Sequence, residues 1–267
     1  MTQAFFDRGW VRFPYDAQLA RWGAAAKPLA EKIAADPMWQ KDWMRCGGTW
    51  FVGVNCLPNG DDGAVNNAVN GVALNGDCVR FIKEHIEPDL TAWDKAQVSI
   101  CYQGYPKPWS GESDAALAYR RNRDAAHVDG LHRQGPDNAR HLLEYHQFLL
   151  GIPLSDSPAN AAPFVVWEGS HKLLQAAFQQ ALLPFPVEQW AQVDLTETYQ
   201  STRRQIFESC KRVELPAKPG ESYVIHRLAL HGMAPWPDDL AGPPEGRMIA
   251  YFRPAEETSI KRWLMAP

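Results

Sequence analysis

From residue 96 onward the chain consists of short apolar or alternating stretches separated by turn signals. Alternating stretches are typical of strands that bury one face, and short continuous apolar runs are typical of strands buried on both. Turn-forming clusters such as Ser155-Asp156-Ser157-Pro158 separate them. The stretches are Ala96–Tyr102, Tyr145–Leu154, Phe164–Trp167, Arg212–Leu215, Ser222–Ile225 and Arg247–Phe252. Strands of this kind predict a mainly β fold with flanking helices, an antiparallel jelly roll.

The first 95 residues mix strand and helix signals. Gly9–Phe13 and Thr49–Val54 have the pattern of strands, whereas Cys78–Glu87 and a segment from the capping residue Asp16 to about Ala35 have that of helices. No repeat or linker divides the 267 residues, a length that fits one large domain. We therefore expect a single domain over residues 1–267. It would have an α/β flank over about 1–95 and a double-stranded β-helix core over about 96–267.

Composition argues against several kinds of partner. The formal net charge of -4 provides no electrostatic footprint for nucleic acid or an anionic membrane. No apolar run is long enough to span a bilayer, and the first residues lack the basic start and apolar core of a signal peptide. The five cysteines are scattered and form no Cys-x-x-Cys pair, which favours small buried thiols in a reducing compartment. We expect a cytoplasmic protein that binds neither nucleic acid nor membrane.

The motif His127-Val128-Asp129 is a candidate for metal binding. In an extended segment, side chains alternate, so His127 and Asp129 point to the same side and Val128 to the other. One imidazole and one carboxylate on one side are two-thirds of a facial metal site, which a second imidazole would complete. The motif alone is common by chance, so its meaning depends on residues further along the chain.

The second imidazole is expected far downstream, because a jelly roll brings distant strands together. His226 and His231 are the histidines found there, and His231 follows the turn after the strand and precedes Gly232. Arg247 stands sixteen residues later, at the head of the last strand, on the face shared by residues 249, 251 and 253. Each residue alone has an ordinary structural explanation. An inward guanidinium, however, needs an anion.

The chain resembles the phytanoyl-CoA dioxygenase family along nearly its whole length. Five features carry the resemblance, and the Gly-Ser-His-Lys box is the most specific part. They are His127-x-Asp129, Asn160–Lys172 with that box at its end, Lys218–His226, His231-Gly232 and Arg247. Departures also occur. Trp167-Glu168 stands where the family usually has proline next to glycine, Glu221 replaces the usual aspartate, and the loop before Arg247 is longer than typical.

The resemblance implies a non-haem iron(II)- and 2-oxoglutarate-dependent dioxygenase with a cupin-like fold. His127, Asp129 and His231 would hold iron(II), and Arg247 would bind the far carboxylate of 2-oxoglutarate. Molecular oxygen would be the other co-substrate, and the products would be succinate, carbon dioxide and a hydroxylated small organic substrate. Relatives that halogenate replace the carboxylate by a small residue, so Asp129 favours hydroxylation. By the same resemblance, His171 and His226 are interpreted as structural.

Two alternatives remain open at this stage. A cupin-type metal-dependent enzyme would share the three metal ligands but would not need Arg247. A binding or sensing module on the same fold would bind metal or ligand without consuming oxygen. The role of Arg120, Arg121 and Arg123 is also open, because they form either a solvated basic face or a contact for an acidic group of the substrate.

Overall fold

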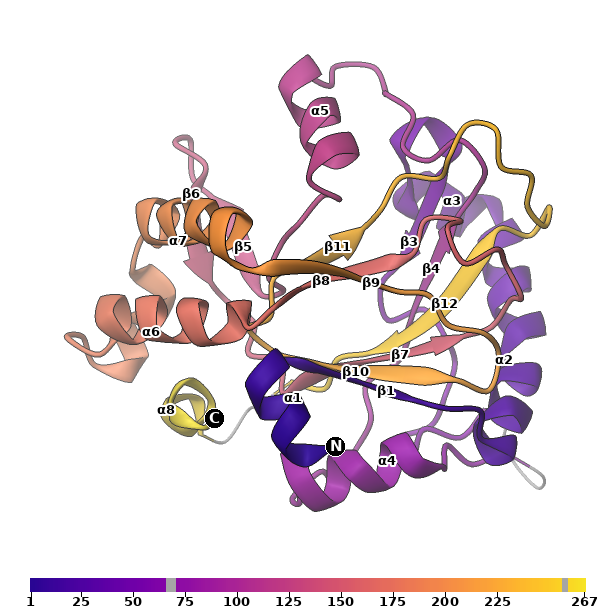
Figure 1. The fold of residues 1–267 in the computed structure, drawn as a ribbon, viewed down its shortest axis with the longest axis horizontal. Helices are drawn as coiled ribbons and strands as arrows, with labels where there is room; N and C mark the ends of the chain where they lie inside the picture. The colour runs from indigo at the N-terminus through magenta and orange to yellow at the C-terminus, as the bar shows by residue number, and fades with distance from the viewer. Residues whose placement is uncertain (66–70, 256–258) are drawn as a thin grey trace.

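Two antiparallel sheets form the centre of the structure, a computed structural model that describes residues 1–65, 71–255 and 259–267 (Figure 1). The large sheet has seven strands in the order β1-β10-β7-β12-β4-β3-β2. The small sheet has the order β11-β8-β9. The strands of the large sheet are β1 (Trp10–Phe13), β2 (Met44–Arg45), β3 (Trp50–Gly53), β4 (Gln97–Cys101), β7 (Phe148–Pro153), β10 (Ser222–His226) and β12 (Arg247–Phe252). Those of the small sheet are β8 (Phe164–Glu168), β9 (Lys211–Leu215) and β11 (His231–Met233).

The chain alternates between the two sheets. After β4 in the large sheet it reaches the edge of the small sheet, where His127 forms a bridge to His231 of β11. It returns to the large sheet as β7, forms β8 and β9 in the small sheet, and then contributes β10, β11 and β12 to the two sheets in turn. This winding is that of a double-stranded β-helix, so the predicted jelly roll is confirmed.

An apolar core fills the space between the sheets. Phe164 and Val166 of the small sheet pack with Ile225, Ile249 and other inward side chains of the large sheet. Adjacent residues of one strand point to opposite faces, which is why alternate positions of β8, β10 and β12 meet here. Toward one end this core gives way to a cavity.

Helix α2 (Ala17–Ala35) covers the outer face of the large sheet (Figure 1). It begins at Asp16, whose carboxylate accepts the backbone N–H groups of Gln18 and Leu19. Its buried residues recur every three or four positions and pack with the strands: Leu19, Trp22, Gly23, Ala26, Ala30 and Ala34. Also on this side are α1 (Thr2–Arg8), α4 (Asp77–Phe81) and a π-helical turn, η2 (Ile82–Ile86).

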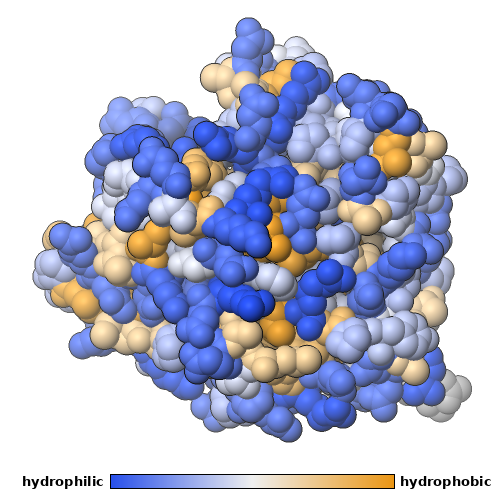
Figure 2. Space-filling view, viewed as in Figure 1, coloured by the Kyte–Doolittle hydropathy of each residue, from blue (hydrophilic) through white to orange (hydrophobic). Residues whose placement is uncertain are grey.

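A second group of helices packs on the small sheet. It comprises α6 (Ser170–Leu182), η3 (Val187–Gln192), α7 (Thr196–Ser209) and α8 (Ile260–Met265). The sequence pattern predicts helices near residues 173–182 and 194–210, and the structure has α6 and α7 there. The face of the molecule seen in Figure 2 is largely hydrophilic, with hydrophobic residues showing between hydrophilic ones. Among the described residues, no helix is both long enough and apolar enough to cross a membrane.

Several elements were not expected from the sequence. They are α1, α3 (Pro37–Trp43), β2, η1 (Cys46–Gly48), α5 (Asp114–Asn122), the hairpin of β5 (Leu131–Gln134) and β6 (Ala139–Leu142), η3 and α8. The pair Asp36-Pro37 ends α2 and also begins α3, because the Asp36 carboxylate accepts the N–H of Met38. Strands β1, β2 and β3, all from the first 95 residues, belong to the same sheet as the core strands. The five cysteines are free thiols, and four of them are buried.

Candidate metal centre

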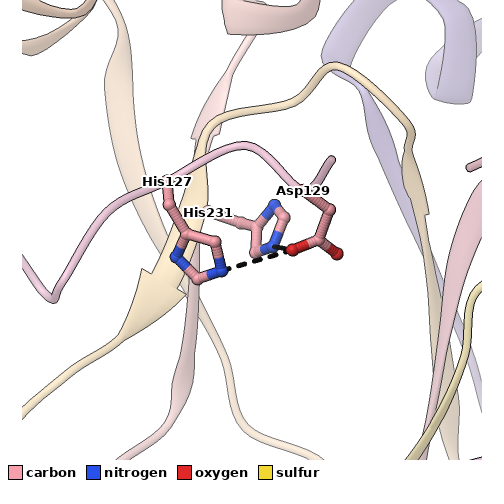
Figure 3. Close-up of side chains that lie close together, drawn as sticks. All are labelled: His127, Asp129 and His231. Carbon is pink, nitrogen blue, oxygen red and sulfur yellow. Dashed lines mark ion pairs between the residues drawn. The ribbon is translucent and has the colours of Figure 1, made fainter. Parts of the chain in front are cut away.

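His127 and His231 are brought together by the backbone. The N–H of His127 donates to the carbonyl of His231 at 2.8 Å, and the N–H of His231 donates to that of His127 at 3.0 Å. Residues opposed in this way in an antiparallel pair carry their side chains on the same side. The ring centroids are 4.7 Å apart. Asp129, two positions after His127, points to this side as well, as the alternation of an extended segment requires (Figure 3).

The three side chains converge on one point. Oδ1 of Asp129 lies 3.4 Å from Nε2 of His127 and 3.7 Å from Nε2 of His231 (Figure 3). The three potential ligand atoms all lie within 4.8 Å of one another. Among the described residues, this is the one group of three or more His, Cys, Asp or Glu side chains with such spacing. Two imidazole nitrogens and one carboxylate oxygen at these separations fit a single transition-metal ion.

Both imidazoles present the correct nitrogen for metal binding. Nδ1 of His127 lies 3.0 Å from the carbonyl of Ala125, and Nδ1 of His231 lies 2.9 Å from the carbonyl of Ala229. A carbonyl can only accept a hydrogen bond, so in the neutral ring each Nδ1 carries the proton and each Nε2 can offer its lone pair to a metal ion. Hydrogen bonds of this kind orient histidines in metal sites.

Nearby positive charge favours an ionised Asp129 although the carboxylate is buried. Its side chain is 10% exposed and that of His231 6%, whereas that of His127 is 49% exposed at the mouth of the site. Burial alone would raise the pKa of Asp129, but the guanidinium of Arg253 and the imidazole of His231 outweigh it and hold the pKa well below its usual range. Partial desolvation of the half-exposed His127 ring would lower its pKa, but its hydrogen bond to Asp129 outweighs this and raises the pKa.

Two glycines permit the close contacts around the site. Gly130, directly after Asp129, has φ 80°, and a Cβ there would collide with the carbonyl of Glu144. Gly232, directly after His231, passes so close to Asp124 that a Cβ would collide with that residue's carbonyl. The backbone N–H of Met233 donates to the same carbonyl at 2.8 Å. The close approach to Asp124 therefore explains why a glycine follows His231.

Neighbouring elements hold the segment before His127. The guanidinium of Arg212 on β9 binds both carboxylate oxygens of Asp124, at 2.7 and 2.8 Å. The hydroxyl of Tyr119 on α5 donates to the carbonyl of Ala126 at 2.7 Å. The candidate motif His127-Val128-Asp129 is thus fixed from two sides by residues that the sequence pattern did not single out.

The Gly-Ser-His-Lys box supports the segment before His231. Oγ of Ser170 accepts the N–H of Leu230 at 2.9 Å, and the N–H of Trp167 donates to the carbonyl of Leu230 at 3.0 Å. His171 donates from Nε2 to the carbonyl of Phe6 at 3.0 Å, which joins α6 to α1. The box therefore connects the helix layer to the strand that begins with His231.

His226 lies apart from the three candidate ligands. It is buried at the end of β10, its Nδ1 accepts the N–H of Leu228 at 3.1 Å, and its ring lies 4.6 Å from that of His171. Burial and the charge of Arg227 hold the pKa of His226 well below the ordinary value. The structure places it in the packing of α1, β10 and α6.

A cavity of about 220 Å³ opens at the three candidate ligands. Apolar and aromatic side chains make most of its wall, with Gln97, Ser99 and Arg253 as further polar residues. The apolar part comprises Trp50, Val52, Val54, Tyr105, Ala125, Leu149, Phe164, Met233 and Tyr251. Pockets with a mainly apolar wall and a few polar groups are typical small-molecule sites.

Arg247 lies behind one wall of this cavity. Its residue surface is 5% exposed, Nη1 lies 3.5 Å from Sδ of Met233, and Nη2 lies 3.5 Å from the hydroxyl of Tyr251. Both partners line the cavity, and Arg247 also borders a separate depression lined by Arg12, Lys218 and Glu221. Within the described ranges, no ion pair joins Arg247 to a carboxylate. The Cys101 thiol and the Tyr223 hydroxyl are its further neighbours, so it is a buried guanidinium among uncharged groups.

The three arginines before His127 do not line the cavity. Arg120 pairs with the buried carboxylate of Glu112 and stacks on Trp109, with its Cζ 4.1 Å from the ring centroid. Arg123 lies over the ring of Phe207 at 4.8 Å, and Arg121 is exposed. These contacts account for Arg120 and Arg123 by packing on aromatic rings.

Arg253 is the residue at this site whose role the sequence did not indicate. It directly follows β12, and Nη1 lies 3.2 Å from Oδ2 of Asp129. The alternation along Arg247–Phe252 places it on the inward face. No local pattern identifies its partner, because Asp129 comes from a distant part of the chain.

Comparisons with known proteins give matches among solved structures alone. No protein-family model matches the chain, and no curated protein matches it. The non-haem α-ketoglutarate-dependent carbocyclase SnoK from nogalamycin biosynthesis is similar over 96% of this chain and 82% of its own, with 14% identity and a TM-score of 0.46. EctD from S. alaskensis with bound Fe is similar over 94% and 74%, with 13% identity and a TM-score of 0.42. AviO1 from Streptomyces viridochromogenes Tue57 is similar over 96% and 94%, with 12% identity and a TM-score of 0.43. Similarities with such low sequence identity and TM-score do not determine the function, which depends on the residues of the site.

Proposed function

We propose that the chain is an iron(II)- and 2-oxoglutarate-dependent dioxygenase that hydroxylates a small organic substrate, with release of succinate and carbon dioxide. One observation carries this proposal: a cavity that contains two imidazoles and a carboxylate has a buried guanidinium without a carboxylate partner behind its wall. The two imidazoles and the carboxylate are suited to binding a metal ion, and the buried guanidinium is suited to binding an anion.

His127, Asp129 and His231 would hold the iron(II). The donor set fits, since both neutral imidazoles can offer Nε2 to the metal and nearby charges favour the ionised form of the Asp129 carboxylate. Two imidazoles and one carboxylate are the ligands of non-haem iron(II) oxygenases, in which the metal supplies the chemistry that activates oxygen. The protein contributes orientation, because both imidazoles are fixed through their backbone and their Nδ1, and the Asp129 carboxylate is held by Arg253.

Arg247 would bind the far carboxylate of 2-oxoglutarate. A buried guanidinium is costly unless an anion compensates it, and a thioether sulfur and a hydroxyl at 3.5 Å compensate it poorly. A carboxylate can accept two parallel hydrogen bonds from a guanidinium, which matches Arg247 with a dicarboxylic co-substrate. In a cupin-type enzyme that does not use 2-oxoglutarate, the Arg247 guanidinium would have no co-substrate carboxylate to bind.

The walls of the cavity favour a small, partly apolar substrate. Trp50, Val52 and Leu149 offer apolar contact, and Gln97 offers a hydrogen-bonding group. The motifs of the sequence support a finer assignment, membership of the phytanoyl-CoA dioxygenase family. The Ser170 and His171 contacts give the most specific of these motifs a structural task. A cytoplasmic location stays a prediction.

The decisive test is succinate release from 2-oxoglutarate by the purified protein with iron(II) and oxygen. We expect slow release without substrate and faster release when a screened small molecule is accepted. If the protein binds iron(II) but never converts 2-oxoglutarate, the cupin-type enzyme or binding module takes the place of this proposal. If it binds no metal, the metal centre itself is wrong.

A further inference from the structure

The carboxylate of Asp129 is divided between two environments. Its Oδ1 faces the imidazoles of His127 and His231, at 3.4 and 3.7 Å. Its Oδ2 faces away from them and lies 3.2 Å from Nη1 of Arg253. Each oxygen therefore has its own partner, and the guanidinium lies on the side opposite the histidines.

Arg253 is fixed in this position. Its Nη2 donates to Oε1 of Gln97 on β4 at 2.9 Å, and its backbone N–H donates to both carboxylate oxygens of Asp94, at 3.1 and 3.0 Å. Its side chain is 15% exposed. Because the backbone and both Nη atoms of Arg253 are held, its guanidinium stays next to Asp129, whereas a mobile surface arginine would move away.

We propose that Arg253 is a positioning residue that restricts Asp129 to binding the metal through Oδ1 alone. The proposal rests on the proposed metal centre. A carboxylate can bind a metal through one oxygen or through both, and binding through both uses one more coordination position. An oxygenase of this type needs the positions opposite its three ligands to remain open. Arg253 holds Oδ2 and so keeps one of these positions free for the co-substrates.

Metal affinity alone does not test this role, because removing Arg253 has two opposing effects. The Asp129 carboxylate loses a partner that orients it, which weakens metal binding. The repulsion between the metal ion and the positive charge of Arg253 is also removed, which strengthens metal binding. The number of water molecules bound to the metal responds to the way Asp129 binds and does not depend on the balance of these two effects.

The experiment uses the full chain loaded with Mn(II), without 2-oxoglutarate, and counts metal-bound water from the magnetic resonance of the ion in ¹⁷O-labelled water. We expect roughly three waters in the parent protein, from three open positions, and one fewer in Arg253→Met. Arg253→Lys, which keeps the charge and a donor, should restore the parent count. Arg247→Met is the matched control from the same strand face and should leave the count unchanged.

Each outcome separates this inference from the function on which it rests. If the parent binds no Mn(II), the metal centre is wrong. If it binds Mn(II) and Arg253→Met has the parent count, the positioning role is overturned while the metal centre stands. Should Arg253→Met fail to fold, Gln97→Leu decides, since it removes the acceptor of Nη2. A count below that of the parent supports the role, and an unchanged count overturns it.

Discussion

His127 and His231 are hydrogen-bonded backbone partners, each donating its N–H to the carbonyl of the other. A strand pair formed by distant parts of the chain thus builds the candidate metal centre directly. The two imidazoles keep their separation because the backbone sets it, and each Nδ1 is held by the carbonyl two residues earlier. A site with this support is organised before a metal arrives.

Replacing Asp129 by alanine should abolish iron(II) binding at roughly micromolar metal, because two neutral imidazoles without a charged ligand make a weak site. Anaerobic equilibrium dialysis measures it directly. Glu144→Ala is a suitable control, since this half-exposed carboxylate pairs with His132 and His146 and lies outside the three candidate ligands. Iron binding in Asp129→Ala as tight as in the parent would show that the motif is not the metal site.

His231→Gln should lose the metal, and His226→Gln should keep it. His226 is buried beside His171, so its replacement should instead lower the free energy of unfolding by about 1–3 kcal/mol through an unsatisfied buried group. Iron titration and urea unfolding of both variants separate the two effects. The assignment is reversed if the first variant retains iron and the second does not.

Asp94 should make the parent protein lose stability as pH rises. Burial raises its pKa to about 6, although the N–H of Arg253 and the charge of that residue act in the opposite direction. A carboxyl whose folded pKa lies above its unfolded value of about 3.9 stabilises the fold fully below that value, and this contribution is lost as pH rises through about 6. The Asp94→Asn variant has no ionisable group at this position. Between pH 5 and 7.5, its free energy of unfolding should therefore rise relative to that of the parent by roughly 1 kcal/mol.

Urea unfolding of both proteins at the two pH values, with a chelator present, measures this difference. The chelator removes any contribution from metal binding, and the titration of other groups cancels between parent and variant. A difference in the free energy of unfolding that stays constant with pH would mean that Asp94 ionises in the fold as easily as in the unfolded chain.

The period of a strand explains which parts of the site were predictable. His127 and Asp129 lie two residues apart, so an extended backbone places them on one side. The same rule placed Arg247 on the inward face of β12, where the structure buries it. The partner of Arg253 could not be predicted, because that ion pair depends on how two distant segments approach each other.

The missed helices have a related cause. Helices α3 and α5 contain no buried residue and have only seven and nine residues, too few for a helical period to stand out in the sequence. Helix α5 is supported by Ser113, which accepts the N–H of Ala116, and by the pairing of Arg120 with Glu112. It nevertheless holds the segment before His127 through Tyr119. Short polar helices of this kind are visible only once tertiary contacts are known.

Arg247→Met should leave iron(II) binding intact but raise the concentration of 2-oxoglutarate required for half-saturation at least about tenfold. A charge-assisted pair is worth about 1.5–3 kcal/mol, and about 1.4 kcal/mol corresponds to a factor of ten. Anaerobic titration of the iron(II) protein, followed by its metal-to-ligand charge-transfer absorption, gives the midpoint. Arg12→Met is the control, because Arg12 lines the separate depression that Arg247 also borders. A shift in Arg12→Met with none in Arg247→Met would place the carboxylate in that depression, and no charge-transfer band in the parent would contradict the oxygenase proposal itself.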